Sequence, residues 1–125
     1  MPELKMKQMQ FETDSWKRRL VFMMDDNIKF KNEISDLLRD NFKQDLLAEV
    51  EEFHTRFLDA DEWIGLLRND ISELDALLVR EIFEDGKILR EIEKKFKRFR
   101  QNLLVVQKKL DILKQDFQSF LTKNT

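Results

Sequence analysis

The chain contains no cysteine, one proline, two glycines and a single histidine among its 125 residues. Without cysteine it can form no disulfide, no thiolate nucleophile and no cysteine-based metal site. Because glycine and proline supply many turns, their scarcity leaves few places where the chain can reverse direction. The abundant residues, Leu, Glu, Lys, Asp and Phe among them, favour long helices, so we expect an all-α protein.

Long apolar runs are also absent, since no run exceeds the five residues Leu20 to Met24. A run of this length is too short to span a membrane, and the amino-terminal stretch MPELKMKQMQ lacks the apolar core of a secretory signal. We therefore expect no membrane span and a cytoplasmic location. The net charge of -2 argues against a general affinity for nucleic acid.

A regular repeat of apolar side chains is present instead. Towards the carboxyl terminus an apolar residue recurs alternately after three and four positions, and neither glycine nor proline interrupts the chain after Gly86. This heptad spacing predicts a long helix over about 87–122 with one buried face. The repeat consists of Leu89, Ile92, Phe96, Phe99, Leu103, Val106, Leu110, Leu113, Phe117 and Phe120.

Two further heptad repeats precede this one. The second covers 46–78 and predicts a helix over about 43–84, while the first runs from Trp16 to Leu37 with Asn27 in a position where an apolar residue is expected. The phase is lost near Asn41, and Gly86 can close a helix in the left-handed conformation. Two points stay open: the first helix starts either near residue 3 or at a cap near Asp14, and the second helix is either continuous or broken near 59–61.

These elements predict one domain, 1–125, folded as an elongated antiparallel three-helix bundle with connections near Asn41 and Gly86. A break near 59–61 would give a four-helix bundle instead. The length, the heptads and the early Trp16 are similar to the spectrin-repeat architecture, a similarity of form that implies no function. Apolar residues beside the heptad positions exceed what a two-stranded coiled coil requires, which favours a bundle and leaves a surplus for self-association.

Charge is distributed unevenly along the chain. Residues 1–43 carry nine basic and eight acidic side chains, 44–86 carry three and thirteen, and 87–125 carry eleven and four. A tight turn at Gly86 would pair residues whose numbers add up to about 171, so the basic stretch 94–100 should face Asp70, Glu73 and Asp75. A turn near Asn41 would pair numbers that add up to about 82 and place Trp16 against Gly65.

The second register also predicts a polar layer of Asn27, His54 and Thr55. Its main expected role is to fix the register of the helices, as a buried Asn does in coiled coils. A ligand site lined by Asn27, His54 and the two tryptophans is a further hypothesis. Glu51 and His54 have the Glu-x-x-His spacing found in di-iron sites, but such a site needs a second histidine and the chain contains only one. We therefore expect no metal.

The basic stretch Lys94, Lys95, Lys97, Arg98 and Arg100 surrounds two aromatic residues and could engage a polyanion or an anionic membrane surface. No phosphate-binding loop, nucleophile elbow or zinc motif occurs. We therefore predict no catalytic residue and no cofactor. The leading hypothesis is a non-enzymatic helical interaction protein, a homo-oligomer or the partner of another helical protein, and the alternative is a module that binds polyanions or membrane surfaces through residues 94–100.

Overall fold

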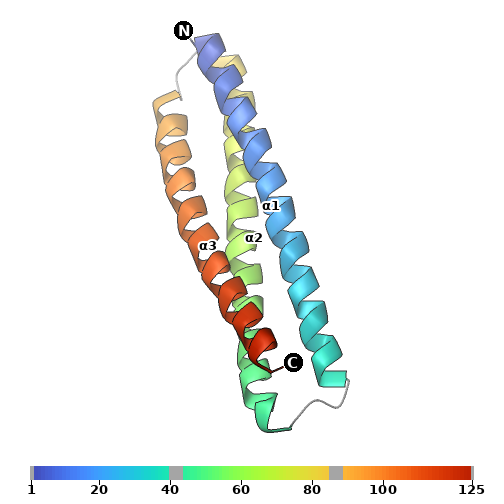
Figure 1. Cartoon of the computed structure of the whole chain (residues 1–125). Coiled ribbons are helices and arrows are strands. Elements are labelled where there is room, and N and C mark those ends of the chain that lie inside the picture. Colours follow the sequence, from blue (N-terminus) through green and yellow to red (C-terminus); the bar gives the residue numbers. More distant parts are fainter. Residues whose placement is uncertain (1, 40–43, 85–88, 125) are drawn as a thin grey trace.

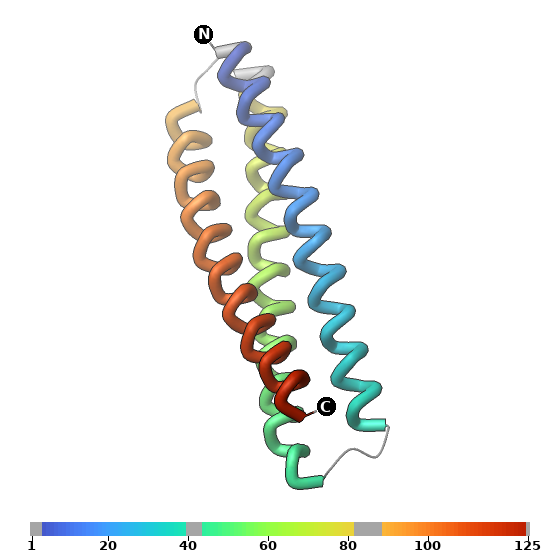
Figure 2. The backbone as a smooth tube through the Cα atoms, viewed as in Figure 1, coloured from blue at the N-terminus to red at the C-terminus, as the bar shows by residue number. Residues whose placement is uncertain are grey.

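The computed structural model describes residues 2–39, 44–84 and 89–124, with side chains for 4–39, 44–81 and 89–124. Three long helices run side by side: α1 is Pro2–Arg39, α2 is Leu47–Glu84 and α3 is Leu89–Lys123, and a short 3₁₀ helix, η1 (Gln44–Leu46), leads into α2 (Figure 1). Helix α2 is antiparallel to α1 and α3, which are parallel to each other (Figure 2). The prediction of an all-α three-helix bundle is confirmed.

Both open points about the helices are resolved by the structure. Helix α1 begins at Pro2, where a proline is tolerated because the first helical N–H has no partner within the helix. Thr13 therefore lies inside the helix, and its buried hydroxyl donates to the Gln10 carbonyl at 2.9 Å. Helix α2 continues through 59–61, so the four-helix alternative is wrong. The predicted turns near Asn41 and at Gly86 lie outside the described residues.

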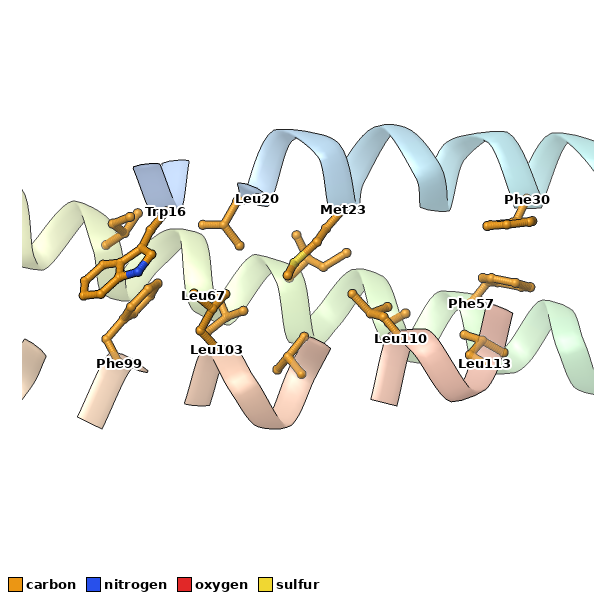
Figure 3. Packing of buried hydrophobic residues seen from close by; sticks show 14 of the residues in the cluster. Trp16, Leu20, Met23, Phe30, Phe57, Leu67, Phe99, Leu103, Leu110 and Leu113 are labelled. Carbon is orange, nitrogen blue, oxygen red and sulfur yellow. The ribbon is translucent and has the colours of Figure 1, made fainter. Parts of the chain in front are cut away.

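The three heptad repeats form one buried apolar cluster along the bundle axis (Figure 3). Every predicted position of α3 from Ile92 to Phe120 is buried, while Leu89 is half-buried. In the lower part of the bundle Phe30 of α1 stacks on Phe57 of α2, with ring centroids 5.4 Å apart, and Phe117 of α3 packs edge-on against both. Burial of these side chains provides the main stabilisation of the fold.

Helix α2 approaches both other helices closely, whereas α1 and α3 meet mainly through large side chains. Trp16 of α1 fills this wider space, with its indole 5.3 Å from the Phe96 ring and 4.7 Å from the Phe99 ring (Figure 3). The prediction that Trp16 packs against Gly65 is wrong, because a Cβ atom placed on Gly65 would meet nothing within 4 Å.

The registers of the two antiparallel pairs differ in how well they were predicted. Between α2 and α3, Arg56 pairs with Asp116 at 2.9 Å, and their numbers add up to 172, close to the predicted value. Between α1 and α2, the ion pairs Lys17–Asp75 and Lys31–Asp61 both add up to 92. The predicted value was too low because the helix ends are staggered: these pairs set Arg39, the last residue of α1, level with Phe53, so the first turns of α2 extend past α1.

The parallel helices α1 and α3 are joined by a regular series of polar contacts. Four contacts recur at intervals of seven residues, each between residues whose numbers differ by 88. Their partners flank the buried heptad positions, as the g and e positions do in parallel coiled coils. The pairs are Lys5–Glu93, Glu12–Arg100, Arg19–Gln107 and Asp26–Lys114.

We predict opposite outcomes for two aromatic truncations on α1. Trp16→Ala should lower the free energy of unfolding by about 3–5 kcal/mol, because it empties the space between α1 and α3. Phe11→Ala should change it by less than about 0.5 kcal/mol, because the Phe11 side chain is 70% exposed. Urea unfolding followed by circular dichroism measures both, and a large loss in Phe11→Ala would contradict this packing.

Candidate interaction surfaces

The basic stretch 94–100 is divided among three environments. Lys95 and Arg98 lie beside Asp70 and Glu73 on the α2 side, as predicted. Arg100 turns instead to α1, where it binds both carboxylate oxygens of Glu12 at 2.8 Å. The predicted partner Asp75 is paired with Lys17 of α1 rather than with α3.

The cationic neighbours of Asp70 do not dominate its pKa. Burial raises the pKa of Asp70 above its ordinary value, and Glu73 adds to this effect, although Lys95 and Arg98 act in the opposite direction. At Asp70, desolvation and the neighbouring carboxylate therefore outweigh the attraction of the two cationic side chains. These charges select which helix faces which more than they stabilise the bundle.

The remaining basic side chains line a groove between α1 and α3, which we call the basic groove. Its volume is about 540 Å³, and its floor contains the apolar side chains of Met9 and Phe96. Lys94 and Lys97 make no ion pair with another described residue. The predicted basic stretch omitted two cationic residues of this groove, Lys5 and Arg90, although Arg90 precedes Lys94 by about one helical turn. The charged lining consists of Lys5, Arg90, Glu93, Lys94, Lys97 and Arg100.

The predicted polar layer is only partly present. Asn27 is buried, and its amide donates to the Phe57 carbonyl at 3.0 Å and to an Asp61 carboxylate oxygen at 2.5 Å. Lys31 donates to the other oxygen of Asp61 at 2.6 Å. His54 and Thr55 are exposed, so they do not belong to this layer. Both residues lie off the buried face of α2, which is formed by positions such as Val50 and Phe57, so no register could have brought them into the core.

The hypothesis of a ligand site lined by Asn27, His54 and both tryptophans does not agree with the geometry. Trp16 packs on the phenylalanines of α3, whereas the Trp63 ring lies 4.8 Å from the Lys109 ammonium group. Together with the exposed His54, these side chains face different parts of the molecule. Within the described ranges, no three His, Asp or Glu side chains come close enough together to hold a metal ion.

A second and larger groove lies between α1 and α2, and we call it the Gly65 groove. Its volume is about 870 Å³, and Leu20 and Ile71 of the core form part of its wall. Val21 on α1 and Leu66 on α2 line it with side chains that are 55% and 63% exposed. The other lining residues are Lys17, Met24, Glu62, Gly65, Arg68, Asn69 and Ser72.

Two local features keep the Gly65 groove open. The ion pairs Lys17–Asp75 and Lys31–Asp61 close the α1–α2 boundary on either side, but Met24 occupies the equivalent position between the two lysines and forms no such pair. Gly65 then leaves the adjoining surface of α2 without a side chain. A glycine inside a helix costs about 1 kcal/mol relative to alanine, and nothing in its own chain requires this one.

None of the described helices is both long and apolar enough to cross a membrane. Comparison of the chain with protein families, with curated proteins and with solved structures finds no match. None of these comparisons supports the similarity in form to the spectrin repeat, so the two grooves carry the functional argument.

We predict that the contact made by Asn27 contributes measurably to stability. Asn27→Ala should lower the free energy of unfolding by about 1–3 kcal/mol, because it removes two hydrogen bonds that involve buried or half-buried groups. Asn32→Ala on the exposed face of the same helix should change it by less than about 0.5 kcal/mol. Equal stabilities of the two variants in urea would show that the polar contact contributes nothing.

Proposed function

We propose that the protein is a non-enzymatic helical interaction protein that self-associates through the Gly65 groove. The observation that carries this proposal is the pairing of an apolar groove with a glycine that has no packing role within its own chain. Glycine is favoured where another backbone approaches closely, and a concave apolar surface with polar edges is typical of an interaction site.

The case for self-association does not rest on an uncovered end of the bundle. A first helix starting near Asp14 would have left the hairpin around Phe99 uncovered, but α1 extends to Pro2 and Phe99 is only 2% exposed. A charged substitution at Phe99 would therefore unfold the protein rather than test its association. The exposed side chains of the Gly65 groove are better positions, because they can change without disturbing the core.

We predict that the wild-type protein is a dimer and that Leu66→Glu is a monomer. A carboxylate at this exposed position would be desolvated at the interface, while the free protein would tolerate it. Ile112→Glu on α3 is the matched control, since Ile112 is 56% exposed but lies away from the groove, and it should remain dimeric. Light scattering coupled to size exclusion gives the mass, and circular dichroism confirms folding.

A monomeric wild-type protein at the highest concentration reached would refute self-association. If such a monomer formed a defined complex with another helical protein, and Leu66→Glu lost that complex, the groove would serve a heterologous partner instead.

The basic groove supports a second candidate function, the binding of a polyanion. Five of its six charged side chains are cationic, and Lys94 and Lys97 have no anionic partner among the described residues. Lysine side chains in this arrangement suit contacts with successive phosphate groups. The net charge of the whole chain is nonetheless slightly negative, which limits any non-specific attraction.

We predict that inorganic polyphosphate binds through Lys94 and Lys97. The double variant Lys94→Gln/Lys97→Gln should weaken binding, and each lysine removed should lower the salt slope by about 1. The control Lys95→Gln/Arg98→Gln should bind nearly as the wild type does, because these two side chains lie beside Asp70 and Glu73. Fluorescence titration at several salt concentrations tests this, and equal losses in both double variants, or no binding at all, would contradict it.

A further inference from the structure

The lining of the Gly65 groove has a symmetry along α2. Glu62 lies three residues before Gly65 and Arg68 lies three residues after it, so the two opposite charges are equidistant from the glycine. Both side chains are exposed, and neither makes an ion pair with another described residue. Two copies of such a helix are complementary when they pack antiparallel, with a two-fold axis passing between them at the level of Gly65 and perpendicular to both helices.

We propose that a second copy of the chain docks on the Gly65 groove, with the two α2 helices antiparallel and a two-fold axis passing at Gly65. This inference rests on the proposed self-association and specifies its geometry. Residues facing each other across the axis have numbers that add up to 130, so Glu62 faces the partner's Arg68 and Arg68 faces the partner's Glu62. Two reciprocal ion pairs result from one pair of side chains.

The apolar lining obeys the same symmetry. Val21 belongs to α1 and lies on the α1 side of Gly65. Asp61 and Asp75 pair with lysines of α1 and so mark the side of α2 that faces α1. Leu66 lies on the other side of α2, away from α1. A two-fold axis between antiparallel helices leaves each flank of α2 on the same side of the interface. Leu66 therefore lies on the same flank as the partner's Leu66, and Val21 lies on the same flank as the partner's Val21.

The α2 positions further from the axis are compatible with this packing. Positions seven residues apart share one face of a heptad-spaced helix, which here carries Leu58, Gly65, Ser72 and Val79. In the antiparallel register Leu58 faces the partner's Ser72, so no like charges oppose each other there. Leu58 and Val79 are 46% and 56% exposed in the single chain, which leaves apolar surface for the second copy to cover.

The glycine itself follows from this geometry. Two helices that cross at a residue without a side chain can bring their backbones close together, as small residues do at tight helix–helix contacts. The single chain gains nothing from Gly65, since a Cβ atom there would meet no other atom within 4 Å. A helix of a different protein would also fit beside a glycine, but it would not account for the equidistant opposite charges.

Charge reversal in the full chain tests the proposal. Glu62→Arg and Arg68→Glu should each raise the dissociation constant of the dimer by about tenfold or more. Each substitution turns both Glu62–Arg68 pairs of the dimer into pairs of like charge. The double variant Glu62→Arg/Arg68→Glu should return to within a few-fold of the wild type. Lys108→Glu, an exposed reversal on α3, is the control and should leave the constant unchanged.

Mixing the two single variants provides a further readout. A copy carrying Glu62→Arg presents two positive charges and a copy carrying Arg68→Glu presents two negative ones, so the mixture should form a heterodimer while each variant alone dissociates. Sedimentation equilibrium measures all of these species. Gly65→Leu should also dissociate and remain folded, because the space around this residue accepts a side chain.

These experiments distinguish a failure of the proposed geometry from a failure of self-association itself. A wild-type dimer that is indifferent to the charge reversals and to Gly65→Leu would show that the protein self-associates through another surface, so this geometry would be wrong while self-association stands. A monomeric wild type would overturn both. A double variant that stays dissociated would also refute the reciprocal pairing.

Discussion

Continuous burial of three heptad repeats in one core is the constraint on which the rest of this structure depends. Each helix presents an apolar face along most of its length, and the three faces can be covered together only if the helices run side by side. The charged residues that flank these faces are then brought into rows. Their ion pairs are largely exposed and individually weak, so they orient the helices after burial has determined that the helices pack.

The sequence predicted the helices themselves better than the register between them. The unbroken phase through 59–61 favoured one helix, and α2 is continuous there. The contrast between acidic α2 and basic α3 correctly placed Lys95 and Arg98 beside Asp70 and Glu73, but Arg100 and Asp75 pair with α1 instead. The register of α1 was missed by about ten in the pair sum because a repeat identifies a buried face but not where along the bundle axis the next helix begins. The error at Gly65 follows from that shift, whereas His54 is exposed because it lies off the buried face of α2.

The surfaces were harder to predict than the core. The contacts between α1 and α3 join residues 88 positions apart and involve parallel helices, which no single turn relates. Sequence periodicity could place Lys94 and Lys97 beside the core but could not show that Arg100 turns to α1 while Lys95 turns to α2. Val21 and Leu66 are among the surplus apolar residues beside the heptad positions, but periodicity could not show that they line one groove together with a glycine.

Departures from the repeat acquire meaning once the packing is known. Asn27 interrupts the apolar face of α1, and the structure accounts for it through its hydrogen bonds to α2. Gly65 and Met24 interrupt a different pattern, the row of charged side chains along the α1–α2 boundary. Met24 packs against the core, whereas no contact with another described residue accounts for Gly65. A residue that costs helix stability without an internal benefit is best explained by a contact outside the chain. The opposite charges placed at equal distances from Gly65 then favour the chain itself as the partner.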